Sequence, residues 1–156
     1  MQISYLADHP EFIPAVARWH HGEWSYLRPG DTLEARIVRL RDSCGHRQIP
    51  TVVIALEGKA ALGSAMLIDH DMDTRMELTP WLAGVFVAPD YRGRGIGVAL
   101  VERIVEEARA LAIQRLNLYT PSAEQFYARR GWLLQERTNY RGADVTVMSL
   151  DLGAGH

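Results

Sequence analysis

Apolar residues recur along the chain with two periods, which separate expected strands from expected helices. Alternating or continuous apolar segments bounded by turn residues predict strands, and apolar residues spaced three to four positions apart predict helices. The expected strands are Gln2–Leu6, Thr51–Leu56, Ala60–Ile68, Leu78–Ala88, Arg115–Thr120, Trp132–Arg137 and Val145–Leu150. The expected helices run from Asp8 or Pro10 to about His21, from Asp31 or Thr32 to just before Gly45, from Gly95 to Ala112 and from Ser122 to about Arg130.

These elements follow the order β-α-α-β-β-β-α-β-α-β-β, which predicts a mixed α/β fold with one sheet and helices on both of its faces. Glu57-Gly58-Lys59 joins two strands as a hairpin, and Gly131 ends the last helix as a left-handed stop. The length fits one domain. We expect that domain to span residues 1–152 and residues 153–156 to form a frayed tail.

The segment Leu78–Ala88 is apolar on both of its alternating faces. A strand of this kind is expected at the centre of the sheet, with both faces covered. Gly84 interrupts the segment and is a candidate β-bulge, because glycine inside a strand often marks an extra residue in the pairing.

This central strand runs into the turn Arg92-Gly93-Arg94-Gly95-Ile96-Gly97, which opens an amphipathic helix. Glycines lack the Cβ atoms that would keep a bulky anion away, and the unpaired N–H groups of a helix's first turn point toward such an anion. Arg92 and Arg94 add positive charge. The turn is therefore expected to bind a phosphate group.

Two common nucleotide-binding motifs do not fit this turn. The dinucleotide fingerprint requires a small third residue, but the two possible frames place Val98 or Leu100 there. The P-loop requires Gly-Lys-Ser/Thr, and the chain has Gly97-Val98-Ala99 instead.

The pattern that remains, Arg92 followed by Gly95 and Gly97 between a strand and a helix, resembles the pyrophosphate-binding motif of the GCN5-related N-acetyltransferases, the GNAT superfamily. A second motif, Ser122 to Trp132 with the pair Phe126-Tyr127 before Gly131, is similar to the superfamily's fourth helix. The resemblance covers roughly Val52 to Leu150. It implies a GNAT-like fold, a mixed and mostly antiparallel central sheet of six to seven strands flanked by four helices.

The resemblance also implies acetyl-CoA as the co-substrate. In this reading the backbone of Val85, Phe86 and Val87 pairs with the pantetheine arm. The amides from Arg92 to Gly97, a range that includes Gly93, Arg94 and Ile96, hold the pyrophosphate. A bulge at Gly84 would free a backbone N–H, that of Val85, to polarise the thioester carbonyl.

Tyr127 occupies the position of the superfamily's general acid, which protonates the departing thiolate. The alternative for Tyr127 is a tyrosine packed in the core beside Phe126. Glu77 is the first candidate for the base that deprotonates the amine, because family members often carry a carboxylate near this point. Glu23, in the loop after the first helix where the family places acceptor-binding residues, is the second candidate. A solvated loop glutamate is the alternative for Glu77, and an amine of low pKa needs no base.

Four further residues are candidates for binding. Ser122 stands where the family more often has an asparagine, and it either contacts the cofactor arm or only caps the helix. Glu23, Trp24 and Trp81 lie near the expected acceptor cleft, although tryptophans are mostly core residues. The acidic stretch Asp69–Asp73 is either a solvated loop or an attraction for a cationic amine.

The charge and composition of the chain limit the kinds of partner and compartment that we expect. The formal net charge of −2 argues against a nucleic-acid surface. Cys44 is the only cysteine, which excludes a disulfide framework and favours a reducing cytoplasm. No segment has the length of a membrane span. We expect no metal, because the acidic stretch departs from the calcium-loop pattern at Thr74 and Pro80.

The sequence thus predicts a cytoplasmic acetyl-CoA-dependent N-acetyltransferase, in which a primary amine of a small molecule or peptide attacks the thioester directly. Two alternatives are transfer of another acyl group and a non-catalytic CoA-sensing or interaction module. The acceptor stays undetermined, and a homodimer is possible because many relatives are dimers.

Overall fold

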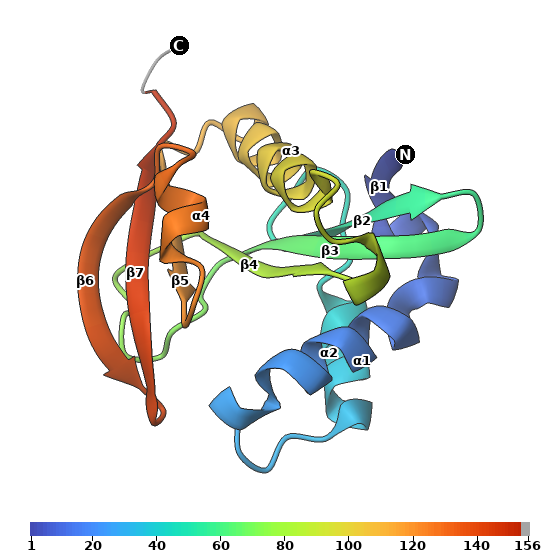
Figure 1. Cartoon of the computed structure of the whole chain (residues 1–156), viewed down its shortest axis with the longest axis horizontal. Helices are drawn as coiled ribbons and strands as arrows, with labels where there is room; N and C mark the ends of the chain where they lie inside the picture. The colour runs from blue at the N-terminus through green and yellow to red at the C-terminus, as the bar shows by residue number, and fades with distance from the viewer. Residues whose placement is uncertain (154–156) are drawn as a thin grey trace.

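The computed structural model describes residues 1–153, in which seven strands form one sheet and four α-helices pack on it (Figure 1). The strands are β1 (Gln2–Tyr5), β2 (Thr51–Glu57), β3 (Ala60–Ile68), β4 (Trp81–Val87), β5 (Arg115–Thr120), β6 (Leu133–Tyr140) and β7 (Ala143–Asp151). The helices are α1 (Ile13–Trp24), α2 (Leu33–Asp42), α3 (Ile96–Ala110) and α4 (Glu124–Ala128). Residues 154–156, most of the expected tail, lie outside the described part.

The sheet has the strand order β1-β2-β3-β4-β5-β7-β6. Every neighbouring pair is antiparallel except β4 and β5, which are parallel. The expected mixed, mostly antiparallel α/β fold and the central place of β4 are therefore confirmed. In Figure 1, β1 to β3 lie on one side of the molecule, β5 to β7 lie on the other, and β4 crosses the centre between them.

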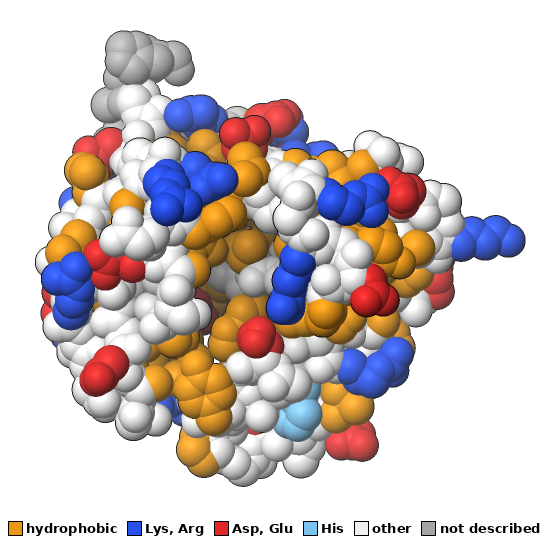
Figure 2. Space-filling view, viewed as in Figure 1, with side chains coloured by type: hydrophobic (Ala, Val, Ile, Leu, Met, Phe, Trp, Pro, Cys, Tyr) orange, Lys and Arg blue, Asp and Glu red, His pale blue; other side chains and the backbone are white. Residues whose placement is uncertain are grey.

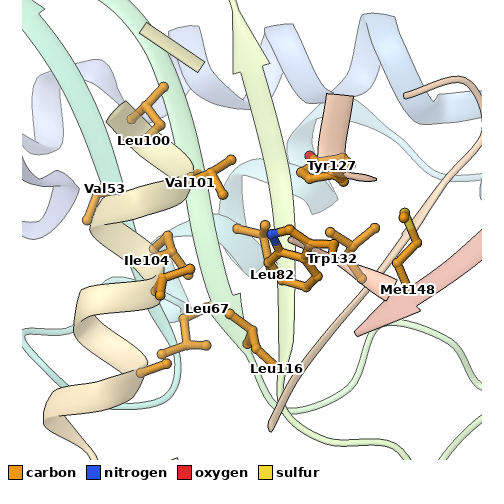
Figure 3. Packing of buried hydrophobic residues seen from close by; sticks show 14 of the residues in the cluster. Val53, Leu67, Leu82, Leu100, Val101, Ile104, Leu116, Tyr127, Trp132 and Met148 are labelled. Carbon is orange, nitrogen blue, oxygen red and sulfur yellow. The ribbon is translucent and has the colours of Figure 1, made fainter. Parts of the chain in front are cut away.

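Two hydrophobic clusters lie on opposite faces of the sheet. On one face α3 packs against β2 and β3 through residues such as Leu100 and Ile104, and Tyr127 of α4 lies near Leu82, Trp132 and Met148 in the same cluster (Figure 3). On the other face α1 and α2 cover Val52 and Ile54. A third cluster, which includes Met72 and Trp81, joins the β3–β4 loop to the ends of β6 and β7. No helix of the described residues is long and apolar enough to cross a membrane.

Several boundaries differ from those expected. Two short 3-10 turns, Leu6–Asp8 and Pro10–Phe12, precede α1, because the backbone at His9 leaves the helical region. The central strand starts at Trp81 rather than Leu78, since the segment before it forms turns. Only its first two residues are buried; Ala83 to Val87 are half-buried, so the expected cover on both faces is incomplete at that end.

Helix α3 carries a buried carboxylate that its apolar spacing does not indicate. Glu107 is fully buried and accepts hydrogen bonds from Tyr5 Oη at 2.7 Å, Arg47 Nη2 at 2.9 Å and Arg103 Nε at 3.0 Å. Burial raises the pKa of Glu107, but the hydrogen bonds from Arg47, Tyr5 and Arg103 outweigh that effect and lower the pKa below 4.5. The cluster therefore ties α3 to β1 and to the segment before β2.

We expect Glu107→Gln to lower the free energy of unfolding by about 2 kcal/mol, because it removes the charge that two guanidinium groups share. The exposed neighbour Glu106 provides the control, and Glu106→Gln should change stability by less than about 0.5 kcal/mol. The lowered pKa means that the Glu107 contribution is complete above its unfolded pKa and is lost as pH falls through the folded one. Urea unfolding at several pH values measures both effects, and equal stability of the two variants would contradict the prediction.

Candidate active site

A cavity lies at the point where β4 and β5 separate. The two parallel strands share one residue pair, Trp81 with Asn117, and Asn117 also bonds to the Pro80 carbonyl through both its backbone N–H and its side-chain amide. Beyond this pair the strands diverge, which leaves a cavity of about 1170 Å³. Figure 2 shows the hollow at the centre of this face, with hydrophobic side chains inside it.

The expected bulge in β4 is confirmed. Between the pairs Ser64 with Phe86 and Met66 with Ala83, β4 has one residue more than β3. Gly84 adopts a φ of 60°, and a Cβ atom there would lie 2.8 Å from Met66 Sδ. The bulge therefore requires glycine, and it places the Gly84–Val85 peptide in the wall of the cavity.

The glycine-rich turn forms the start of α3, as its sequence indicates. Gly93 and Gly95 have φ values of 81° and 79°, whereas Gly97 lies within the helix. The Ala99 N–H donates to the Gly95 carbonyl at 3.1 Å, so the preceding N–H groups of the first turn have no partner within the helix. These amides and the dipole of a 15-residue helix suit an anion.

The two arginines of the turn are exposed, and each already contacts the protein. Arg92 Nε donates to the Val87 carbonyl at 2.8 Å, and its guanidinium lies 5.5 Å from the Phe86 ring centre. Arg94 pairs with Glu57 at 3.0 Å. Arg92 thus holds the turn against the end of β4, while the charge of Arg94 is shared with Glu57.

Tyr127 lies on α4 and lines the cavity. Its ring packs against Phe126 and Trp132, with ring centres 5.0 and 5.9 Å away. Figure 3 shows the hydroxyl at the end of the ring that points away from Met148. Burial raises the pKa of Tyr127 to about 12 against a smaller opposing effect of Arg130, and the hydroxyl bonds to no residue among those described. Tyr127 is therefore both a core ring and a protonated hydroxyl in the cavity wall.

Ser122 is exposed and lines the cavity, but it does not cap α4. Thr120 stabilises the turn before the helix: its Oγ1 accepts hydrogen bonds from the N–H groups of Ser122 at 3.3 Å and Ala123 at 2.9 Å, whereas α4 itself has no side-chain cap. The helix itself begins at Glu124, later than expected. Of the two roles considered for Ser122, the structure does not show the helix cap; the contact with the cofactor arm stays a prediction.

The expected base and a second carboxylate occupy different positions. Glu77 is exposed in the turns before β4 and does not line the cavity. Asp71 lies in the cavity wall, partly buried, and none of the side-chain hydrogen bonds within residues 1–153 involves it. Burial raises the pKa of Asp71 to about 7. Sequence reasoning placed Asp71 in an acidic stretch that could attract an amine, but gave no reason to single it out.

The three expected acceptor residues separate into two groups. Glu23 and Trp24 line the cavity from the end of α1. Trp81 does not: it is fully buried in the third cluster, and its Nε1 donates to the Leu78 carbonyl at 2.8 Å. Trp81 is therefore a core residue, as most tryptophans are, and not part of the cavity wall. Phe86 and Val87 lie beside the turn rather than in the cavity.

The fold is similar to those of solved acetyltransferase structures. An N-acetyltransferase from Staphylococcus aureus Mu50 is 17% identical with a TM-score of 0.76, covering 98% of this chain and 100% of that one. The putative acetyltransferase yncA from Salmonella typhimurium, solved with its cofactor acetyl-CoA, is 19% identical with a TM-score of 0.72, covering 100% and 96%. An aminoglycoside 6'-N-acetyltransferase complexed with coenzyme A is 15% identical with a TM-score of 0.77, covering 97% of each chain.

No curated protein sequence matches the chain significantly. The model of the acetyltransferase (GNAT) family, in contrast, matches residues 13–132. This span includes the β4 bulge, the glycine-rich turn and Tyr127. The chain therefore belongs to the GNAT family of acetyltransferases.

Proposed function

We propose that this GNAT acetyltransferase transfers an acetyl group from acetyl-CoA to a primary amine by direct attack of the amine on the thioester. One observation carries the proposal: Gly84 and Val85 of the β4 bulge and Tyr127 line one cavity, and the start of α3, which lies outside the cavity lining, packs at Gly97 against Val87 and against Phe126, the neighbour of Tyr127. The bound acetyl-CoA of yncA and coenzyme A of the aminoglycoside acetyltransferase support the choice of donor. Residues 1–152 form the proposed catalytic domain.

The residues fit a CoA thioester. The amides from Arg92 to Gly97 hold the pyrophosphate, and the half-buried backbone of Val85 to Val87 pairs with the pantetheine arm, with Ser122 beside it. The Val85 N–H donates to the thioester oxygen, where negative charge grows during attack. Tyr127 donates a hydrogen bond to the departing thiolate as the C–S bond breaks. Glu23 and Trp24 contact the acceptor at the other end of the cavity.

Two carboxylates are candidates for the base that takes the proton of the amine. Glu77 stays the choice from sequence, acting through water because it lies outside the cavity. Asp71 is favoured by its position in the cavity wall, and a pKa of about 7 suits a base near neutral pH. Tyr119, which shares the cavity with Asp71, has its pKa raised by burial and by the Asp71 charge.

Asp71→Asn should lower kcat/KM at pH 7 by about 10². The wild-type rate should rise with pH through about 7, because Asp71 must lose its proton to act, and the variant should lose this limb. Glu77→Gln serves as the matched carboxylate control, with an expected change below about threefold. A larger loss for Glu77→Gln than for Asp71→Asn would reverse the assignment. The measurement is a pH profile of thiol release.

A thermal-shift titration with acetyl-CoA, coenzyme A and longer acyl-CoAs tests the proposed function, followed by thiol release across amine classes. Binding of acetyl-CoA at 100 times its Kd should stabilise the fold by about 2.7 kcal/mol. A shift with amine-dependent thiol release supports the proposal. No shift with any CoA species would refute it, a shift without thiol release would favour a sensor, and preference for a longer chain would change the acyl group.

A further inference from the structure

A buried histidine and a buried serine lie directly behind the β4 bulge. His20 of α1 is 4% exposed and Ser64 of β3 is fully buried. His20 Nε2 lies 2.8 Å from Ser64 Oγ, and Ser64 Oγ donates to the Gly84 carbonyl at 2.8 Å. Three segments far apart in sequence thus meet at one backbone carbonyl.

The direction of each hydrogen bond follows from the number of protons. A serine hydroxyl has one proton, and in Ser64 it is directed to the Gly84 carbonyl. His20 Nε2 must therefore carry a hydrogen and donate it to Ser64 Oγ. Burial, and next the charge of Arg36, lower the pKa of His20 to about 3, so the imidazole is neutral at physiological pH. With the proton on Nε2, His20 donates to Ser64 Oγ, and Ser64 Oγ donates to the Gly84 carbonyl. Each of the two hydrogen bonds then has one donor and one acceptor.

The Gly84 carbonyl determines where the next N–H points. The peptide between Gly84 and Val85 is trans, since among residues 1–153 only the bonds before Pro50 and Pro80 are cis. In a planar trans peptide the C=O and N–H bonds point in opposite directions. A carbonyl held toward Ser64 therefore turns the Val85 N–H away from β3, on the side opposite Ser64.

This peptide needs such a restraint because the bulge interrupts the ladder. At the bulge, two residues of β4 stand opposite Ala65, so regular pairing with β3 does not fix both of their peptides. Glycine tolerates many backbone conformations, and a rotated Gly84–Val85 peptide would present its carbonyl oxygen where a donor is required. His20 Cε1 and Met66 also lie 3.0 Å or less from the Cβ position of Gly84, which closes that side.

We propose that His20 and Ser64 are positioning residues that hold the Gly84–Val85 peptide with the Val85 N–H directed at the thioester oxygen. This inference rests on the proposed acetyltransferase function. His20 also contacts Trp24, with ring centres 5.3 Å apart. His20 and Ser64 therefore connect Trp24, proposed to contact the acceptor, to the Gly84–Val85 peptide of β4. The two residues act through the backbone and do not touch the reacting atoms.

The decisive measurement is the infrared band of the thioester carbonyl in bound, isotope-labelled acetyl-CoA. A hydrogen bond from Val85 N–H polarises the carbonyl and shifts its band to lower wavenumber than in free acetyl-CoA. Ser64→Ala should return the band at least halfway to the free value and lower kcat at least tenfold. The Kd for acetyl-CoA should change by less than about threefold, because most of the binding energy comes from the α3 turn and β4.

Three variants separate positioning from stability. Ser64→Thr keeps the hydroxyl and should restore both the band and most of kcat. Thr51→Val removes another fully buried hydroxyl that donates to a backbone carbonyl, that of Gly45 at 2.6 Å, and it should lower stability without moving the band. His20→Phe keeps a ring but removes the donor to Ser64, so it should shift the band in the same direction as Ser64→Ala. It also provides the test if Ser64→Ala does not fold.

The outcomes distinguish this inference from the function on which it rests. Acetyl-CoA that binds Ser64→Ala and His20→Phe with the wild-type band position would overturn the inference and leave the proposed function intact. A wild-type band equal to that of free acetyl-CoA would overturn it as well. A wild-type chain that binds no acetyl-CoA would refute the proposed function, and the inference with it.

Discussion

Tyr127→Phe is expected to lower kcat by about 10²-fold and to leave the affinity for acetyl-CoA unchanged within about threefold. In this variant the thiolate of CoA would leave without a hydrogen-bond donor from residue 127, in a buried part of the cavity. A loss of 10² in rate corresponds to about 2.7 kcal/mol, the size expected for one strong hydrogen bond to a developing charge.

The raised pKa of Tyr127 defines how the hydroxyl acts. Near pKa 12 it stays protonated at every pH at which the protein can be assayed, so no falling limb from Tyr127 should appear below about pH 10. A thiol near pKa 8.5 is a much stronger acid than this phenol. Tyr127 therefore stabilises the thiolate by donating a hydrogen bond to it and keeps its own proton.

Phenylalanine keeps the packing of the ring against Phe126 and Trp132, so the melting temperature of Tyr127→Phe should stay within a few degrees of wild type. Steady-state kinetics, the Kd for acetyl-CoA and the melting temperature together test the role. A fall in kcat below threefold would leave Tyr127 as a core residue. A fall that comes entirely from weaker acetyl-CoA binding would contradict the acid role as well.

The parts of the fold that the sequence predicts are those set by local chemistry. Gly84 predicts the bulge because glycine alone accepts its backbone conformation. Gly131 has the expected positive φ, 90°, but α4 ends at Ala128, before the expected boundary near Arg130, and turns connect the two. The start of α1 was not predicted. Asp8 and Pro10 favour a helix locally, but the fully buried Leu6 ties the preceding segment to the core and two 3-10 turns form first.

The parts of the site that were not predicted depend on contacts between distant segments. Asp69, Asp71 and Asp73 look alike in sequence, and only the packing of Met72 into the third cluster fixes the loop so that Asp71 is partly buried in the cavity wall. Ser64 has no local sign of a role, since its partners lie 44 and 20 residues away. The cofactor turn was predicted because all of its groups come from one continuous segment.

Gly95→Val is expected to weaken CoA binding at least tenfold, which is the largest change in cofactor affinity that we predict. Gly95 has a φ of 79° and stands directly before α3, and a β-branched residue in this conformation is strongly disfavoured. Valine therefore forces the turn to rotate, which moves the amides proposed to hold the pyrophosphate. Direct crowding is not the cause, because no described residue other than its chain neighbours lies within 4 Å of a Cβ at this position.

Gly142 offers a matched control for that strain. It has a φ of 89° and lies in the turn between β6 and β7, and apart from its chain neighbours no residue of the described part lies within 4 Å of its Cβ position. Both valine variants should lower the melting temperature by similar amounts, a few degrees for about 1 to 2 kcal/mol of strain. Only Gly95→Val should weaken CoA binding in calorimetric titrations, because only its turn presents amides to a phosphate. Equal CoA affinities in the two variants would mean that the pyrophosphate binds elsewhere and that the amides at the start of α3 do not hold it.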